Sequence, residues 1–298
     1  MMQSLPEWRR EKVSAFAEFT PEDSVLTKLR FNAALQETFK DFRSTMTAHT
    51  PIGYLTLNER TTFNKLNDLN LSAQSDWQLT ESHFLVAGAE YIKGDLDTST
   101  KSKSFMGSSS SMAEGSQTTW ALYAQDEWSA TEDWTLAGGA RYTNVKNQID
   151  NTNDTKVSVG SESKANTAVS LGAVYSGFDN WNLRSNFSQG FRMANLQDMF
   201  IGAMGLLIPN PNLKPEESNN FEVGARYNHN GFSLDTGVYY TTAKNYMDVQ
   251  AVGSQYITVN QDSAKTVGME TALSYKFDSG IKHIRISQSL NVSLRTRM

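Results

Sequence analysis

The sequence predicts an all-β chain that forms an antiparallel up-and-down transmembrane β-barrel, and three observations lead to this prediction. Apolar and polar residues alternate with a period of two over most of the 298 residues, whereas helical periodicity is scarce. The alternating segments have the length of tilted strands that cross a bilayer. Short and long connections follow one another in turn, as they do in outer-membrane barrels.

The alternation predicts about twelve strands, most of them longer than the roughly 5–6 residues usual in globular proteins. In the segment 25–42, for example, Phe31 and Leu35 lie on one face, and Arg30 and Asn32 lie on the other. The predicted strands cover residues 11–19, 25–42, 62–79, 83–93, 117–128, 134–148, 166–176, 181–191, 218–228, 232–247, 263–277 and 281–292. Most of them reach the roughly 9–11 residues that a tilted strand needs to cross the bilayer.

The connections between these strands predict which end of the barrel faces the outside of the cell. Short turns are predicted at residues 20–23, 80–83, 129–133, 176–180, 228–231 and 278–280. Long connections are predicted at residues 43–61, 94–116, 149–165, 192–217 and 248–262. Outer-membrane barrels place short turns in the periplasm, so we expect the long connections to be external. The serine-rich stretch 94–116 is expected to be a polar, mobile loop.

Aromatic and charged residues are distributed as a membrane barrel requires. The aromatic residues beside the predicted short turns, where an interfacial girdle belongs, are Trp77, Trp128, Trp134, Tyr175, Trp181, Tyr227 and Tyr275. The charged residues on the polar faces of strands, where a watery lumen is expected, include Lys28, Arg30, Arg184, Glu222, Arg226 and Glu270. A soluble β-sandwich or β-helix is the alternative, and both features favour the barrel.

Composition excludes several classes of function. The net charge of -5 and the pI near 5.5 give no electrostatic footprint for nucleic acid. The absence of cysteine removes disulfides, thiolate catalysis and cysteine-ligated metal sites. No apolar run reaches the eighteen residues of a spanning helix. The motifs Gly-x-Ser-x-Gly and His-Glu-x-x-His and the phosphate-binding loop are also missing, so we do not expect an enzyme.

The first twelve residues, MMQSLPEWRREK, carry charges but no apolar stretch as long as a secretory signal. We therefore expect no signal peptide within the chain as written. We expect it to be either cytoplasmic or an internal piece of a longer exported protein.

The stretch 191–218 is rich in apolar residues in its middle, from Met199 to Ile208, and has asparagine and proline at both sides. It begins with FRMANL (191–196) and ends with NPNLKPE (210–216) followed by Glu217 and Ser218. Here the sequence resembles the TonB-dependent outer-membrane receptors. In the heme and hemoglobin branch of that family, a Phe-Arg-Ala-Pro-Asn-Leu box and an Asn-Pro-Asn-Leu-Lys-Pro-Glu box bracket one external loop.

Further segments resemble strands of the same family, and together the resemblance covers most of residues 60–277. These segments are YAQDEW (123–128), LAGGARY (136–142), NNFEVGARY (219–227) and GMETALSY (268–275). The resemblance implies an N-terminal plug domain, a box that contacts TonB and a barrel of about 22 strands whose last strand ends in an aromatic residue. Residues 1–298 are therefore interpreted as part of such a barrel, without the plug and the final strand. An unclosed sheet has edges that lipid cannot satisfy, so we do not expect this polypeptide to transport anything by itself.

The framed loop is the candidate substrate-binding site. Its candidate residues are Phe191, Arg192, Met199, Met204, Asn210, Pro211, Asn212 and Leu213. Arg192 suits a ligand carboxylate, although an ion pair that fixes the loop is the favoured alternative. The thioethers of Met199 and Met204 are possible ligands of heme iron. Packing of the loop in an apolar patch over the barrel mouth is the favoured alternative for them.

The heme branch implies a histidine ligand between the two boxes, and this loop has none. The four histidines of the chain are His49, His83, His229 and His283. Of these, His49 alone lies on a predicted external connection, where a solvated loop histidine is favoured over an iron ligand. We predict no metal site.

The expected function is the uptake of an iron carrier, heme or a siderophore, across the outer membrane of a Gram-negative bacterium. The resemblance implies as partners the outer-membrane lipid, the iron carrier or a heme protein, and the energy-coupling protein TonB, reached through the plug of a full-length parent. We expect no permanently bound cofactor; heme or a ferric siderophore would be a transported ligand. A passive porin- or adhesin-like barrel, or an inactive truncated gene product, are the alternatives.

Overall fold

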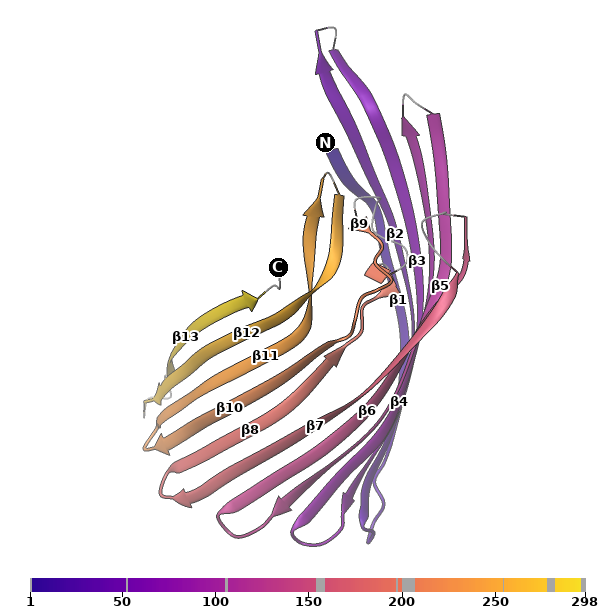
Figure 1. Cartoon of the computed structure of the whole chain (residues 1–298). Helices are drawn as coiled ribbons and strands as arrows, with labels where there is room; N and C mark the ends of the chain where they lie inside the picture. Colours follow the sequence, from indigo (N-terminus) through magenta and orange to yellow (C-terminus); the bar gives the residue numbers. More distant parts are fainter. Residues whose placement is uncertain are drawn as a thin grey trace.

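A computed structural model of the chain shows one sheet of 13 strands (Figure 1). The structure describes residues 2–51, 53–104, 107–153, 159–196, 198–199, 207–253, 255–277 and 282–295. The strands are β1 (Met2–Phe19), β2 (Leu26–Thr50), β3 (Gly53–Gln78), β4 (His83–Ser104), β5 (Gly107–Ser129), β6 (Trp134–Thr152), β7 (Gly160–Phe178), β8 (Trp181–Arg192), β9 (Leu207–Ile208), β10 (Glu216–His229), β11 (Phe232–Val252), β12 (Gln255–Lys276) and β13 (Lys282–Arg295).

Each strand pairs antiparallel with the next along the chain, except that β9 pairs in parallel with β12. The strands curve into a trough, with the short turns at its lower end and the long hairpins at its upper end (Figure 1). The strand order ends at β1 and β13, which do not pair with each other within the described residues, so the sheet is open there. The predicted antiparallel up-and-down architecture is confirmed. Within the same residues, no helix is long and apolar enough to cross a membrane.

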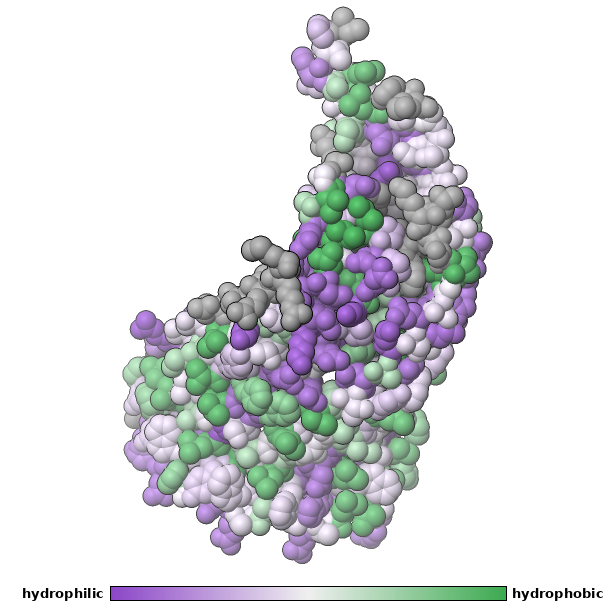
Figure 2. All heavy atoms as spheres, in the orientation of Figure 1, coloured by the Kyte–Doolittle hydropathy of each residue, from purple (hydrophilic) through white to green (hydrophobic). Residues whose placement is uncertain are grey.

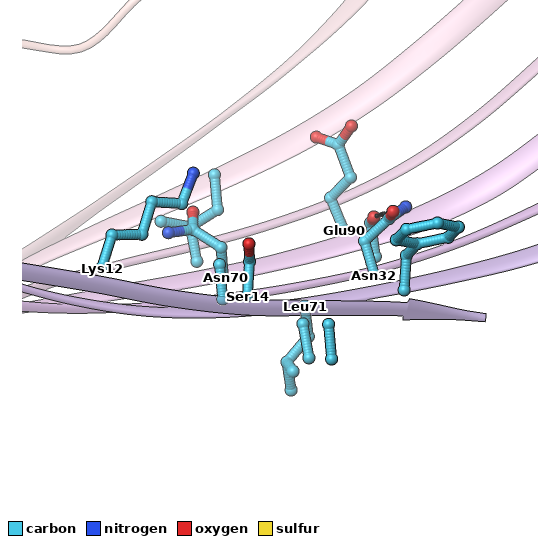
Figure 3. Close-up of a pocket in the computed structure, with 12 residues that line it drawn as sticks. Lys12, Ser14, Asn32, Asn70, Leu71 and Glu90 are labelled. Carbon is cyan, nitrogen blue, oxygen red and sulfur yellow. Dashed lines mark hydrogen bonds between the residues drawn. The ribbon is translucent and has the colours of Figure 1, made fainter.

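The register places polar and apolar residues on opposite faces, as the alternation predicts. Asn32 lies opposite Ser72, and Ala33 lies opposite Leu71. Figure 3 shows Asn32 and Glu90 on one side of the sheet and Leu71 on the other. The polar side is the concave, inward face, and the apolar side is the outward face. Large apolar side chains that are exposed on the outward face include Val13, Phe31, Leu35, Leu71, Leu122, Leu171, Val223, Val238, Val267 and Met269.

The strands lean because the register shifts from one strand to the next. Moving from each residue to its partner on the next strand leads from Trp77 on β3 to Val267 on β12. Trp77 lies one residue before the short-turn end of β3, whereas Val267 lies nine residues before the short-turn end of β12. The shift is roughly one residue per strand, which corresponds to a strand tilt of about 35°. This tilt lies in the range that closed membrane barrels require.

Aromatic rings line the short-turn end of the sheet and contact each other across strands. The ring centroids of Trp134 and Tyr175 lie 4.8 Å apart, and those of Trp181 and Tyr227 lie 4.9 Å apart. Figure 2 shows hydrophobic residues spread over the lower part of the molecule, and above them a hydrophilic region with a compact hydrophobic patch over it. The predicted aromatic girdle is therefore present at this end.

Tyrosine rings also lie over glycines on the inward face. A Cβ atom on Gly88 would come within 2.4 Å of the ring of Tyr123, and one on Gly268 within 2.2 Å of the ring of Tyr239. The hydroxyl group of Tyr123 donates a hydrogen bond to Oε1 of Gln74 at 3.2 Å. The missing side chain thus makes room for a ring that spans neighbouring strands.

The long connections differ from the prediction, because most of them are strands. In the stretch 94–116, β4 continues to Ser104 and pairs there with Gly107 of β5, so this stretch is a projecting hairpin and not an irregular loop. Residues 43–61, 149–165 and 248–262 likewise lie largely in strands, and β1 begins at Met2. Outside the bilayer, the two arms of a hairpin still satisfy each other's backbone groups, and serine and threonine are compatible with strands.

Candidate functional site

After Arg192 the chain leaves the sheet and folds onto the inward face, inside the trough (Figure 1). We call residues 193–215 the docked segment; the structure describes 193–196, 198–199 and 207–215 of it. The segment includes β9, whose Leu207 and Ile208 pair with Tyr256 and Ile257 of β12. It returns to the sheet at β10. The framed loop of the sequence is therefore held against the wall of the trough.

The docked segment is anchored by an apolar cluster. Its own buried members are Ala194, Leu196, Met199 and Leu213, and the wall contributes Leu96 of β4, Ile149 of β6 and Met247 of β11. Leu66 and Met193 pack against the cluster. Met199 is 0% exposed and Leu213 is 2% exposed. Leu96, Ile149 and Met247 lie on the inward face of their strands. Nearer the short turns, the inward face is polar, so it becomes apolar where the segment docks.

Asn147 of β6 forms a buried polar contact inside this anchor. Its side chain is 0% exposed. Its Nδ2 donates to the carbonyl oxygen of Ala194 and to Sδ of Met199, both at 3.2 Å. Its Oδ1 accepts a hydrogen bond from Nε2 of Gln117 at 2.7 Å. Since both ends of the amide have partners, Asn147 is buried without an unsatisfied group and fixes the segment next to β6.

On the opposite side, β12 holds the segment through Thr258. The Thr258 hydroxyl donates to Oδ1 of Asp198 at 3.2 Å, and its carbonyl accepts from Nδ2 of Asn210 at 2.9 Å. The backbone N–H of Asn210 donates to the carbonyl of Asp198 at 2.8 Å. Asp198, just after the first box, and Asn210, at the start of the second box, therefore meet at one threonine.

Asn260 of β12 fixes the end of the segment in the same way. Its Oδ1 accepts from the N–H of Lys214 at 2.7 Å, and its Nδ2 donates to the carbonyl of Lys214 at 3.0 Å. The same Nδ2 donates to the carbonyl of Asn245 at 2.6 Å. The side-chain amide of Asn260 thus satisfies both backbone groups of Lys214, as a neighbouring strand would.

Arg192 and Glu216 close the base of the segment. An Nη atom of Arg192 lies 2.7 Å from Oε2 of Glu216, which also accepts the N–H of Met247 at 3.2 Å. The side chain of Arg192 is 58% exposed and that of Glu216 is 17% exposed. An ion pair this exposed contributes at most about 1 kcal/mol. Its geometry agrees with the predicted alternative, in which Arg192 fixes the loop.

The structure places the eight predicted site residues in different environments. Arg192, Pro211 and Asn212 are exposed, and Asn210 is half-buried. Met199 and Leu213 are buried in the anchor, so Met199 does not present its sulfur to solvent. Phe191 precedes Arg192 on β8 and so lies on the outward face. Met204 lies outside the described residues. Their binding role stays a prediction.

Sequence reasoning missed the wall residues that receive the segment. A signal was present, because Leu96 and Ile149 are apolar at positions where the inward-facing alternation predicts polar residues. The predicted strands ended before these positions, at 93 and at 148. Nothing in the local sequence marks Asn147 as the partner of Ala194, 47 positions later, or Thr258 as the partner of Asp198, 60 positions earlier.

Below the docked segment, the inward face carries paired charges. Nη1 of Arg184 lies 2.8 Å from Oδ1 of Asp235, and Nε of Arg226 donates to Oδ2 of Asp235 at 2.7 Å. Nε of Arg184 lies 3.5 Å from Oε1 of Glu222. Arg184, Glu222 and Arg226 were predicted to face the lumen, and their mutual pairing agrees with that placement.

Within the described ranges, no three histidine, aspartate or glutamate side chains lie together as metal ligands would. His49 lies near the tip of the β2–β3 hairpin, with its ring 5.1 Å from that of Tyr54 in an edge arrangement. Along β2 it lies well beyond Thr38, the residue that pairs with Leu66 beside the docked segment. The geometry offers no partner histidine for iron in this part of the chain.

Comparison with known families identifies the sheet. A family model described as TonB dependent receptor-like, beta-barrel, matches residues 4–296. The chain belongs to the TonB-dependent receptor family. The trough in Figure 1 is therefore barrel wall of this family.

Two relatives and one solved structure show what the chain is similar to. The chain is 27% identical, over 121 residues, to a probable hemoglobin and hemoglobin-haptoglobin-binding protein of Haemophilus influenzae, covering 34% of this chain and 12% of that protein. It is 25% identical, over 219 residues, to an iron-regulated outer membrane virulence protein of Vibrio cholerae, covering 67% and 30%. The ferric yersiniabactin uptake receptor of Yersinia pestis superposes with a TM-score of 0.69 at 16% identity, covering 97% and 44%. The chain thus spans less than half of each of these proteins.

Proposed function

We propose that this barrel wall serves in the uptake of an iron carrier, heme or a ferric siderophore, across the outer membrane of a Gram-negative bacterium, with energy supplied by TonB. The plug and the remaining strands belong to parts of the receptor outside residues 1–298. One relative is named for binding hemoglobin, and one is named as iron-regulated. A superposing structure is named for ferric yersiniabactin uptake.

The docked segment is the observation that carries this proposal. It is held on the inward face by an apolar cluster and by side chains of β6 and β12. A loop that folds into the trough narrows the passage and offers a surface there to a ligand arriving from outside.

In this proposal, the ligand contacts the exposed residues of the docked segment and its base. These are Arg192, Asn195, Pro211, Asn212 and Lys214. Arg192 and Lys214 suit the carboxylates of heme or of a siderophore. Met199 contributes packing in this arrangement, because its sulfur is enclosed against Asn147. Iron ligation by Met199 would require the anchor to open first.

The test is a binding titration on the full-length receptor that contains this chain. Hemin binding is followed by the Soret band, and ferric siderophore binding by quenching of tryptophan fluorescence. The combined variant Arg192→Gln and Lys214→Gln is expected to weaken binding by at least about 10-fold, the effect of losing one charged hydrogen bond. Lys101→Gln, on the distant β4–β5 hairpin, is the control and is expected to bind normally.

The outcomes separate the alternatives. A Soret shift selects heme, and quenching by the siderophore without a Soret shift selects the siderophore. Binding of neither, together with free passage of small solutes through reconstituted vesicles, would support a passive pore. Absence of the polypeptide from outer-membrane fractions, measured by mass spectrometry, would support an inactive gene product.

A further inference from the structure

The apolar band of the outward face ends at a second row of aromatic residues, away from the short turns. Tyr91 of β4, Trp120 of β5 and Tyr142 of β6 lie there and are 37% to 40% exposed. The rings of Trp120 and Tyr142 have centroids 5.1 Å apart. These residues lie eight to nine positions from the short-turn ends of their strands. With a tilt of about 35°, that length covers about 22–25 Å, close to the height of about 25 Å of the apolar band of an outer-membrane barrel.

Directly beyond this aromatic row, two lysines and a threonine lie side by side. Lys93 of β4 pairs with Thr118 of β5, and Thr118 pairs with Lys146 of β6. All three share the outward face with the aromatic row. Adjacent strands are about 4.8 Å apart, so the Cα atoms of the two lysines are separated by about 10 Å. Their flexible four-carbon stems let both amines reach one anionic group above Thr118.

Both lysines are available to an external anion, because Lys93 has one exposed ion pair and Lys146 has none among the described residues. Nζ of Lys93 lies 3.0 Å from Oδ1 of Asp95, with 41% and 48% of the two side chains exposed. A pair so exposed is weak and exchanges readily with another anion. Lys146 is exposed and forms no salt bridge with another of the described residues. Asp95 and Asp97 lie farther along β4, so the amines lie nearer to the apolar band than the carboxylates do.

The same order of residues recurs elsewhere on the outward face. Beyond the band, the first outward-facing charged residue is also a lysine on β3, β11 and β12, namely Lys65, Lys244 and Lys265, whereas it is a glutamate on β1, β2 and β10, namely Glu11, Glu37 and Glu217. Lys65 lies 3.0 Å from Glu37, so the pair Lys93 and Lys146 differs from this part of the rim in having an amine without a glutamate partner. Amines at this height meet the phosphates of the surrounding lipid.

We propose that Lys93, Thr118 and Lys146, above the rings of Trp120 and Tyr142, bind a phosphate group of lipid A, the phosphorylated glycolipid of the outer leaflet. The long hairpins rise from this rim, so the site faces the outer leaflet. The rings contact the acyl chains and sugars at the interface, and the two amines with the Thr118 hydroxyl hold the phosphate. The inference depends on the outer-membrane location proposed above and does not depend on the identity of the iron carrier.

The test measures lipid binding to the full-length receptor in detergent by native mass spectrometry, without any iron carrier present. Purified lipid A and phosphatidylglycerol are titrated separately. The combined variant Lys93→Gln and Lys146→Gln is expected to bind lipid A about 30-fold more weakly than the unchanged protein, which is the effect of two amines at the lipid surface. The control is Lys12→Gln with Lys164→Gln, which removes the same charge from the inward face.

A lipid A affinity that falls equally in both variants, or in neither, would overturn the proposal. Phosphatidylglycerol that binds as tightly as lipid A would overturn the choice of lipid. Both substitutions are at exposed positions, where changes in stability stay within about 0.5 kcal/mol, and the far-UV circular dichroism of each variant reports whether the sheet is intact. A loss of iron-carrier binding with retained lipid A binding would count against the proposed transport and leave the lipid site standing.

Discussion

Replacement of Leu213 by alanine should release the docked segment from the wall of the trough. Leu213 is 2% exposed and packs in the apolar cluster with Met199, Ile149 and Met247. Truncation of a leucine buried to this degree costs about 2–5 kcal/mol, from lost burial and from the cavity that remains. The cost falls on a local structure that opens more easily than the sheet, so the segment should open while the strands persist.

Amide hydrogen exchange, read by mass spectrometry, measures that opening. The N–H of Asn210 donates to the carbonyl of Asp198 at 2.8 Å, and the N–H of Lys214 donates to Asn260 at 2.7 Å. The amide of Lys214 loses its acceptor on β12 when the segment leaves the wall. The amide of Asn210 is bonded within the segment, and it becomes less protected because Asp198, its acceptor, is itself held in place by Thr258. A loss of at least about 2 kcal/mol corresponds to exchange at least about 30-fold faster at these two positions.

The matched control is Leu171→Ala, which shortens a leucine that is 59% exposed on the outward face. Exchange at Asn210 and Lys214 should not change in that variant. If Leu213→Ala left the exchange of both amides within about twofold of the unchanged protein, the apolar cluster would not be what holds the segment, and the docking described here would be refuted.

Three further substitutions test the wall itself. Gly88→Ala should destabilise the folded protein by about 1–3 kcal/mol, because its Cβ would enter a tyrosine ring, whereas Gly160→Ala, with nothing within 4 Å, should be neutral in heat denaturation. Leu171→Lys should lower the fraction inserted into vesicles through a cost of about 2–4 kcal/mol on the lipid side, and equal insertion of the inward-facing Ser170→Lys and Leu171→Lys would contradict the assigned faces. Asn147→Leu should lower the urea midpoint through loss of about 1–3 kcal/mol for each partner left unsatisfied, and an unchanged midpoint would show that water replaces the amide.

The strands and their faces could be predicted from the sequence because they depend on a local property, the alternation of side chains. Phe31, for instance, lies across from Ala73 on the outward face, and Arg30 lies across from Gln74 on the inward face, as the pattern indicates. The ends of the strands were less predictable. Alternation between apolar and polar residues stops where the bilayer stops, whereas backbone pairing continues to Ser104 and Gly107 in the β4–β5 hairpin.

The position of the candidate site along the chain could be predicted from the sequence, but the residues that surround it could not. The two boxes locate it, and the apolar middle indicates that it packs against something. Its partners depend on tertiary contacts between distant parts of the chain, such as Asn147 with Ala194 and Thr258 with Asp198. No periodicity in the sequence encodes these contacts. The prediction that Met199 lies in a patch over the barrel mouth agrees in kind with its burial, but the depth of that burial follows from Leu96 and Ile149, residues that lie outside the predicted strands.

The docked segment ties together two strands that are far apart along the sheet. Asn147 on β6 bonds to Ala194, and Thr258 on β12 bonds to Asp198, only four residues later. Five strand spacings separate β6 from β12 in the sheet order, about 24 Å along the curved wall. The segment therefore bridges two parts of the curved wall. Strand number and shear set the radius of a closed barrel, and this bridge adds a direct link between β6 and β12 that should resist local spreading of the wall.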